Sequence, residues 1–323
     1  MASGCGRCRR FSHNAMRNDP AVRVRAMLLL ITLLWGLNLP VLKWLTGEFD
    51  PVLLSAVRMA ASILPMLVLL RRWRCWQSPD RGQWLQLVVC GVVMVYLNQW
   101  LLSAGLARST ATNGALITAL TPLMSAMLAL WLLRERISGR RLWGVALGLA
   151  GVALVILQRP GAQLAHGGVG DGMVVLAVLL FAFGAVLIQR LVGKLNAVVI
   201  GIGVHAVGSA CLVLHTLVQA AWMGEVPAMP GQAGLWGVAI ASGILSTGIG
   251  NFLWSRAIAQ VGMARAAVWL YWVPLFGVVA AVGLLGEPVT VWHAVALLLV
   301  FVGTYLGTAT GSVAQVLGKP RHP

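Results

Sequence analysis

Charged residues are scarce in this chain. They make up 10% of its 323 residues, and only eight side chains are acidic, whereas soluble domains carry roughly 25% charged residues. Apolar residues account for 59%. This composition excludes an ordinary soluble protein and predicts an all-α integral membrane protein.

Acidic residues are absent from the long apolar stretches. A hydrocarbon core about 30 Å thick requires about 20 helical residues, and ten stretches qualify as spans: 26–45, 52–70, 84–104, 110–132, 142–157, 172–190, 198–220, 235–255, 264–285 and 291–309. None contains Asp or Glu. A proton exchanger driven by an intramembrane carboxylate is therefore not expected. Facilitated diffusion, or coupling through the titratable His205, stays open.

Catalytic and metal-binding patterns are also absent. The sequence has no H-E-x-x-H, G-x-S-x-G or phosphate-binding loop. Cys5 and Cys8 form a single C-x-x-C, short of the four ligands of a structural zinc site. We expect no enzyme, no cofactor and no metal.

Basic residues dominate the remaining charge, with a formal net charge of +16. They gather in alternate connecting segments, whereas Glu48, Asp50, Asp171, Glu225 and Glu287 fall mainly in the others. This positive-inside pattern predicts that both termini are cytoplasmic in a bacterial inner (plasma) membrane. The charge indicates membrane topology rather than nucleic-acid binding.

A duplicated block divides the chain into two halves. PLMSAMLALWLLRE, beginning at Pro122, recurs 152 positions later as PLFGVVAAVGLLGE, beginning at Pro274, and the same displacement pairs Gly91 with Gly243. Five spans per half make the halves inverted repeats. The predicted organisation is a basic, disordered cytoplasmic tail 1–25, a first repeat 26–157, a linker 158–171, a second repeat 172–309 and a cytoplasmic tail 310–323. Glu135 and Glu287, which end the two blocks, are expected to hydrogen-bond within turns.

These features together resemble the EamA family of the drug/metabolite transporter superfamily. The resemblance covers residues 26–309 and includes the W-G-x-N-x-P run from Trp35 to Pro40 and both duplicated blocks, although Phe183-Gly184 echoes Trp35-Gly36 only weakly. It implies spans 1–4 and 6–9 around a central cavity, with spans 5 and 10 at the periphery. It also implies movement of small organic solutes such as amino acids, other metabolites or drugs, commonly as export.

Polar and aromatic side chains at helical spacing within the spans are the candidate solute-binding residues, because such groups face a cavity or another helix. They are Asn38, Arg58, Tyr96, Asn98, Gln99, Thr118, Thr121, His205, Thr247, Asn251, Trp254, Trp269, Tyr271 and Trp272. The repeat pairs Gln99 with Asn251, so these stripes are expected to converge. One hydroxyl-rich side and one aromatic side suit a solute with an apolar portion and a few polar groups. Bonding within or between helices, and a place in interfacial belts for Trp, are the alternatives.

Arg58 is the one full charge well inside a span. A central Arg costs roughly 2.5–3.5 kcal/mol on insertion scales, so we expect it to reach the outer surface or to pair with Glu48 or Asp50. Binding a solute carboxylate is the alternative.

Glycine ridges mark the fifth and tenth spans. Gly144, Gly148 and Gly151 recur at short helical spacing in one, and Gly303, Gly307 and Gly311 in the other. Such spacing predicts close helix packing, either within the monomer or at a homodimer face.

The sequence favours an inner-membrane exporter of small organic solutes that works by alternating access. A membrane scaffold or sensor without transport activity is the alternative. The expected partners are a small organic solute and the lipid bilayer.

Overall fold

The computed structural model of the chain describes residues 20–73, 76–121, 123–125, 127–128, 139–157, 168–191, 194–224, 227–261 and 268–308. The first half contains α1 (Pro20–Leu45), α2 (Pro51–Trp73), α3 (Arg81–Cys90), η2 (Gly91–Leu97), α4 (Asn98–Ala107), α5 (Ala111–Thr118) and α7 (Gly139–Leu157). The second half contains α8 (Gly168–Gln189), α9 (Ala197–Met223), α10 (Ala233–Ser242), η3 (Gly243–Ile249), α11 (Gly250–Val261), η4 (Val268–Tyr271), α13 (Trp272–Leu285) and α14 (Val291–Thr308).

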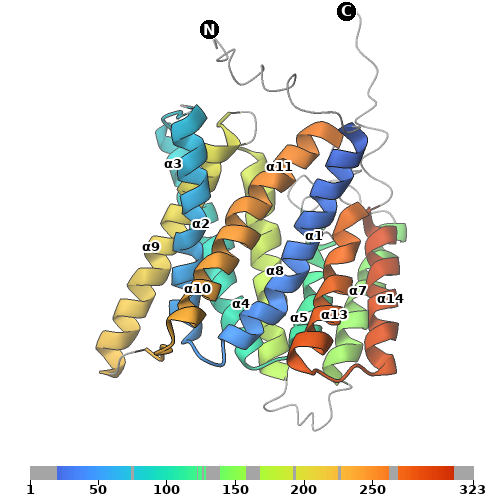
Figure 1. Cartoon of the computed structure of the whole chain (residues 1–323). Helices are drawn as coiled ribbons and strands as arrows, with labels where there is room; N and C mark the ends of the chain where they lie inside the picture. The colour runs from blue at the N-terminus through green and yellow to red at the C-terminus, as the bar shows by residue number, and fades with distance from the viewer. Residues whose placement is uncertain are drawn as a thin grey trace, which may run out of the picture.

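Each of the ten predicted spans contains helix, so the all-helical membrane fold is confirmed. Six helices of the described residues are long and apolar enough to cross a bilayer, and three shorter apolar helices accompany them. The described chain enters α1 at one end of the bundle and α8 at the other, so these counterparts run in opposite directions (Figure 1). Helix α1 begins at Pro20, so residues 20–25 of the predicted disordered tail are helical and that boundary was wrong. The rest of that tail (1–19), with the Cys5–Cys8 pair, the tail 310–323, most of the linker and Glu135 lie outside the described residues.

The third span of each half has the same irregularity in its backbone. Helices α3 and α4 are joined by the seven-residue π-helix η2, and α10 and α11 by the seven-residue π-helix η3. Each π-helix begins at one member of the glycine pair Gly91 and Gly243. Because π-helix is rare and is often found at functional sites, this shared irregularity shows that the sequence repeat is also a structural repeat.

Eight spans form a closed ring. In order of contact, the ring runs α2, α10–η3–α11, α1, α13, α5, α8, α3–η2–α4, α9 and back to α2. Helices α7 and α14 pack against each other beside α5, at one edge of the bundle (Figure 1). Spans 5 and 10 therefore have the peripheral position that the family resemblance implied.

Glycines bring α7 and α14 into backbone contact. A Cβ added at Gly303 would lie 2.6 Å from both the carbonyl oxygen of Gly144 and the amide nitrogen of Gly148. One added at Gly151 would lie 2.9 Å from the carbonyl oxygen of Ala296. These glycines pack within one chain, which confirms the intramolecular alternative for them; Gly311 lies outside the described residues.

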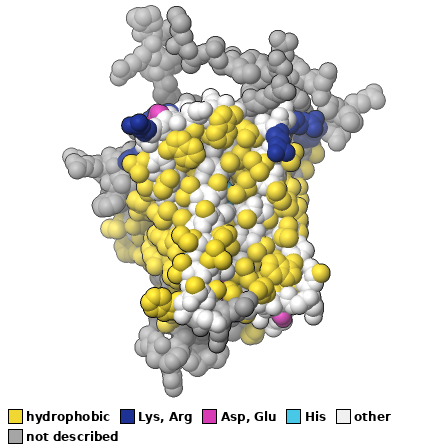
Figure 2. Space-filling model, turned by 90° about the vertical axis from the view of Figure 1, so that its left-hand side faces the viewer, with side chains coloured by type: hydrophobic (Ala, Val, Ile, Leu, Met, Phe, Trp, Pro, Cys, Tyr) yellow, Lys and Arg dark blue, Asp and Glu magenta, His cyan; other side chains and the backbone are white. Residues whose placement is uncertain are grey.

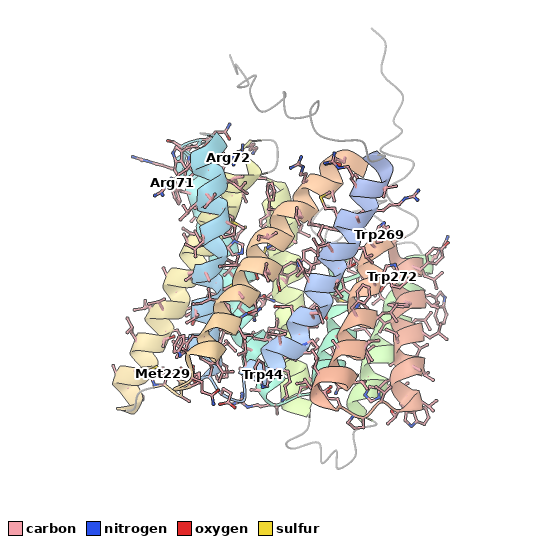
Figure 3. The ribbon with its side chains drawn as sticks, in the orientation of Figure 1. Trp44, Arg71, Arg72, Met229, Trp269 and Trp272 are labelled. Carbon is pink, nitrogen blue, oxygen red and sulfur yellow. The ribbon has the colours of Figure 1, made fainter. Side chains whose placement is uncertain are left out.

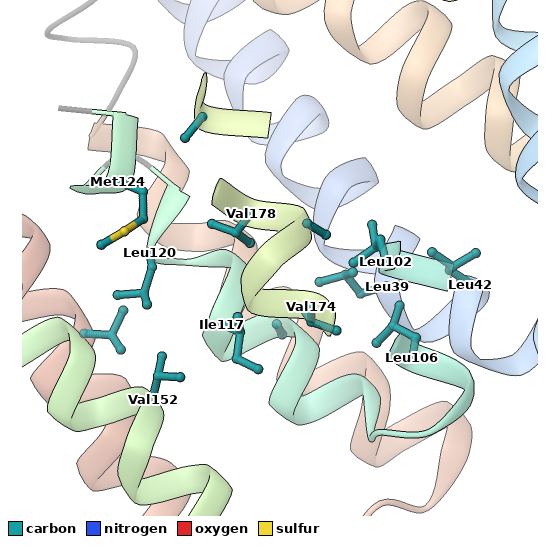
Figure 4. Close-up of a cluster of buried hydrophobic side chains, with 14 of the residues drawn as sticks. Leu39, Leu42, Leu102, Leu106, Ile117, Leu120, Met124, Val152, Val174 and Val178 are labelled. Atoms are coloured by element: carbon teal, nitrogen blue, oxygen red, sulfur yellow. The ribbon is translucent and has the colours of Figure 1, made fainter. Parts of the chain in front are cut away.

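The largest apolar core joins helices of both halves near one end of the ring. Leu39 and Leu42 of α1 lie near Leu106 of α4, Ile117 of α5 and Val174 of α8 (Figure 4). This end is therefore held by apolar packing between the two repeats, in addition to its polar contacts.

The visible molecular surface is apolar over the middle of the bundle, and Lys and Arg gather at one end of it (Figure 2). Arg71 and Arg72, at the end of α2, lie at the end where α1 begins, whereas Trp44 and Met229 lie at the opposite end (Figure 3). By the positive-inside rule we call the Arg71 end the inner end and the Trp44 end the outer end.

Asp171 lies in a helix, not in the connecting loop where it was expected. Helix α8 begins at Gly168, so Asp171 lies in its first turn, where it is completely buried. Its carboxylate accepts hydrogen bonds from the Ser109 hydroxyl and the Asn113 amide, and a helix N-terminus favours negative charge. The expectation that the acidic residues stay outside the helices was wrong at this position.

Candidate solute site inside the helix ring

Arg58 projects from α2 across the outer part of the ring. It lies seven residues after Pro51, about 10 Å along the helix, and is 1% exposed. Its Nε donates to Ser242 Oγ at 3.0 Å, and its Nη2 donates to Asn38 Oδ1. Within the described part of the chain its buried Nη1 has no hydrogen-bond partner.

The expected routes for this charge are therefore wrong. The guanidinium does not reach the surface, and its hydrogen bonds go to neutral oxygens of α1 and α10. Asp50 instead caps α2, because Oδ1 accepts the backbone N–H groups of Val52 and Leu53 at 2.9 and 3.1 Å, and its Oδ2 accepts from Gln219 at 3.2 Å. Glu48 is exposed.

The same face of α2 is joined to α4 through hydroxyl groups. Ser55, one turn before Arg58, has its Oγ 2.7 Å from Ser103 Oγ and 3.1 Å from the backbone oxygen of Gln99. Asn98 Nδ2 donates to the carbonyl of Ala177 on α8 at 2.8 Å, and its Oδ1 accepts from the Gln99 side chain. Asn98 thus bonds between helices, which is the structural alternative for this candidate.

Aromatic side chains gather where α1 meets η3 and α11. Trp35 donates from Nε1 to the backbone oxygen of Ser246 at 2.9 Å, and its ring centroid lies 5.4 Å from that of Trp254. Trp269 packs against the same apolar cluster as Trp35. Trp272 is 48% exposed and stacks on Phe276, and Figure 3 places it with Trp269 beside α1. The Tyr271 side chain lies outside the described part.

Three candidates bond within their own helices. The hydroxyls of Thr118 and Thr121 donate to the backbone oxygens of Ala115 and Thr118, at 3.0 and 2.6 Å. His205 Nδ1 donates to the Gly201 carbonyl, four residues earlier, at 2.8 Å. Thr and Ser often make such bonds in helices, so these contacts by themselves do not indicate a solute site.

Within the described residues, none of the remaining candidates shares a hydrogen bond with Arg58. Tyr96 of η2 has its hydroxyl 3.3 Å from His215 Nδ1 on α9, and both rings pack with Trp100. Thr247 on η3 and Asn251 on α11 are half-buried. The structure thus places Asn38 beside Arg58 and Trp254 beside Trp35, while Tyr96 belongs to a separate interface between α9 and the third span.

Sequence reasoning missed three partners of the site, namely Ser55, Ser242 and Trp35. Ser242 directly precedes the paired Gly243, and Ser55 lies on the same helix face as Arg58, so helical spacing and the repeat could have indicated both. Trp35 was noted only as part of the W-G-x-N-x-P run, yet it lies three residues before Asn38, on the same side of α1.

Glu287 joins the two halves at the outer end. Its carboxylate accepts the backbone N–H groups of Ala111 and Thr112 at 2.7 and 2.8 Å, and the Thr112 hydroxyl at 2.7 Å. The backbone N–H of Glu287 closes the turn that ends α13, on the Ala281 carbonyl at 3.4 Å, as expected. Its carboxylate does more than was expected, because it caps α5 of the first half.

The two counterpart segments α4 and α11 differ in their neighbours. Helix α4 packs on α8 and also on α2 and α1, which closes the outer end. Helix α11 packs on α1, whereas the described residues show no comparable packing of α11 on α8 or α9. The contacts that close one end of the ring therefore have no counterpart of similar extent at the other.

Comparisons with known proteins agree with this architecture. The EamA-like transporter family matches residues 24–157 and 168–308, one match in each half. An uncharacterized transporter of Bacillus subtilis, YyaM, is 23% identical over 299 residues, covering 90% of this chain and 95% of its own. An uncharacterized inner membrane transporter of Escherichia coli, YedA, is 24% identical over 299 residues, covering 88% of this chain and 92% of its own.

A solved structure titled "Crystal structure of protein" shares the fold, with a TM-score of 0.64 and 18% identity over 92% of this chain and 99% of that one. The two repeats, the ring of eight spans and the family match over both halves together show that this chain belongs to the EamA-like transporter family and is a multi-pass membrane transporter.

Proposed function

We propose that the protein exports small organic solutes across the bacterial inner membrane by alternating access, with both termini in the cytoplasm. The observation that carries this proposal is the unequal packing of α4 and α11. A symmetric ring closed at both ends would be as compatible with a scaffold as with a transporter. In the described residues, helix packing closes the ring at the outer end, which is the arrangement of an alternating-access carrier in the state that takes up solute from the inside.

Inversion of the repeats supplies the second state. If α11 moves onto α8 and α9 while α4 separates from α2 and α1, the same contacts form at the opposite end. The π-helices η2 and η3 lie directly before these two segments. We propose that they are the joints, because π-helical turns interrupt regular helix at positions that often have a function.

The solute would bind inside the ring, between the polar group around Arg58 and the aromatic group around Trp35. We assign Asn38, Arg58, Gln99, Thr247, Asn251, Trp254 and Trp269 to its lining, on the basis of their helices and burial. Thr118, Thr121 and His205 contribute less, since their polar atoms already bond to their own helices.

Transport by purified protein in proteoliposomes tests the proposal. Vesicles preloaded with radiolabelled amino acids, organic acids, amines or lipophilic drugs should release at least one class faster than protein-free vesicles, with saturable kinetics. Folded protein that releases none of them would favour the scaffold or sensor. Repeating the assay under imposed pH gradients separates proton coupling from facilitated diffusion.

A further inference from the structure

The described residues provide no counter-charge for Arg58, whose hydrogen bonds go to neutral side chains. We propose that Arg58 is the anchor for a carboxylate, and that the transported solutes are organic monoanions with an apolar or aromatic body. This inference rests on the transport function proposed above and adds a substrate class to it.

The first argument is the hydrogen bonding of the guanidinium. It has five N–H donors in a rigid fork, but its two hydrogen bonds go to the uncharged Asn38 and Ser242, and Nη1 is buried with no partner in the described residues. A buried charge without a counter-charge is strongly unfavourable. A solute carboxylate reaching Nη1 would satisfy both the free donor and the charge.

The second argument is that three carboxylates of the described residues are engaged elsewhere. Asp50 caps α2 and accepts from Gln219, Asp171 accepts from Ser109 and Asn113, and Glu287 caps α5. Each of these acids bonds to donors of the protein other than Arg58. Within the described part of the chain no acid is left for Arg58, and a bound molecule would supply the counter-charge.

The third argument comes from the repeat. A Cβ at Gly243 would meet the carbonyl oxygen of Arg58, and one at the paired Gly91 would meet the carbonyl oxygen of Val204. Val204 therefore occupies the position in α9 that Arg58 occupies in α2, and it is buried and apolar. The architecture tolerates an apolar side chain at this position, so helix packing alone does not require the Arg58 charge.

The surroundings also indicate which anion fits. Asn38 carries an NH2 group beside its accepting oxygen, which can donate to the second oxygen of a carboxylate held by Arg58. Trp35 lies three residues before Asn38 on α1 and packs on Trp254, which gives an aromatic surface for the solute body. A zwitterion would bring an ammonium group as well, but Asp50, Asp171 and Glu287 are already engaged and Glu48 is exposed. A monoanion is therefore favoured over an amino acid.

A matched set of four solutes tests this assignment in proteoliposomes: 3-phenylpropanoate, phenylalanine, 3-phenylpropanamide and phenethylamine. Wild-type protein should move 3-phenylpropanoate at least tenfold faster than the other three. Arg58→Met should reduce that flux at least tenfold, and Arg58→Lys should give an intermediate rate, because lysine keeps the charge but not the fork. Arg71→Met removes a charge from the inner end of α2 and should match wild type.

Thermal unfolding in detergent separates an anchor from a structural latch. Arg58→Met should melt at or above the wild-type temperature, since replacing an uncompensated buried charge by an apolar side chain is often neutral or stabilising. Added 3-phenylpropanoate should raise the Tm of wild type but not of Arg58→Met. A marked fall in Tm for this variant together with loss of flux for every solute would show a structural role and overturn the proposal.

The outcomes also distinguish the two proposals. If wild type carries other solutes and Arg58→Met is unchanged toward all of them, transport stands and the anchor fails. If wild type carries no solute but its Tm still responds to 3-phenylpropanoate in an Arg58-dependent way, the anchor stands and transport fails.

Discussion

Helices α4 and α11 occupy equivalent places in the two repeats, yet they are held very differently. Helix α4 is fixed by Asn98 bonding to α8, by Ser103 bonding to Ser55, and by the carbonyls of Leu106 and Ala107 accepting from Lys43 of α1. Helix α11 has its main packing on α1, through Ala257 and Leu253 and the ring contact of Trp254. Two repeats of the same fold therefore form a ring in which α4 is held by more contacts at the outer end than α11 is at the inner end.

The side chains of α2 and α9 account for part of this difference. Close contacts at Gly243 and Gly91 align Arg58 with Val204, and counting three residues back along each helix aligns Ser55 with Gly201. Ser55 bonds to α4, but glycine at the equivalent place has no side chain with which to hold α11. Different side chains at equivalent positions of α2 and α9, such as Ser55 and Gly201, therefore favour closure at the outer end.

The strongest test of the comparison is to lock α4 onto α2. In a background without the native cysteines, Ser55→Cys and Ser103→Cys place two thiols where the hydroxyl oxygens lie 2.7 Å apart. A disulfide between them should abolish transport in proteoliposomes, because the outer end can no longer open. Adding reductant should restore it.

The two single-cysteine variants are the controls and should retain transport under oxidising conditions. If the disulfide forms quantitatively, as shown by mass spectrometry, and flux continues unchanged, opening at α4 is not part of the transport cycle.

The inner end can be examined with Gln99→Cys and Asn251→Cys, which occupy paired positions on α4 and α11. Both native side chains are half-buried. Because α11 is not sealed against α8 and α9, we expect a membrane-impermeant thiol reagent added at the inner side to modify the Asn251→Cys protein about tenfold faster. This estimate rests on the dependence of thiol reactivity on exposure.

Equal rates for the two thiols, measured in inside-out vesicles from the inner side, would mean that both ends of the ring are equally closed. A faster reaction at Gln99→Cys would reverse the assignment of the sealed end.

The architecture of ten spans in two halves could be predicted from the sequence, since the lengths of the apolar stretches and the duplicated block indicate it. The glycine ridges also predicted close helix packing, which the structure shows between Gly303 and both Gly144 and Gly148. These features depend on composition and on spacing within one helix. They need no knowledge of which helices are neighbours.

The partners of polar residues could not be predicted in the same way. Asn38 and Ser242 meet Arg58 only because α1, α2 and α10 converge with particular rotations about their axes. Asp171 is buried because Ser109 and Asn113 reach it from a different hairpin. The π-helices have no sequence signature of their own, and Gly91 and Gly243 marked them only in retrospect.

Glu287 tests how firmly the outer end is held between the halves. In the Glu287→Ala variant, the N–H groups of Ala111 and Thr112 and the Thr112 hydroxyl lose their acceptor. Unsatisfied donors cost about 1–3 kcal/mol each, so we expect the free energy of unfolding to fall by roughly 3 kcal/mol or more when water does not replace the carboxylate. Denaturant unfolding in micelles measures this change.

The matched control at the same helix end is Thr110→Ala, which removes the side chain that caps α5 by accepting from the backbone N–H of Asn113 at 3.1 Å. Loss of an N-cap costs about 1 kcal/mol. If Glu287→Ala destabilises no more than Thr110→Ala, the bond between the halves contributes little to the closure of the outer end.

The smallest effect is expected outside the ring, where α7 and α14 touch. A Cβ at Gly303 would lie 2.6 Å from backbone atoms of Gly144 and Gly148, so Gly303→Ala must push these helices apart. Overpacking of this kind costs about 1–3 kcal/mol.

Gly283→Ala in α13 is the matched control, because nothing lies within 4 Å of its added Cβ, and alanine favours helix over glycine by roughly 1 kcal/mol. Its Tm should stay the same or rise while that of Gly303→Ala falls. Since α7 and α14 lie beside the ring and not in it, the substrate preference of Gly303→Ala should match wild type; a changed preference would show that the edge helices help to set the difference between α4 and α11.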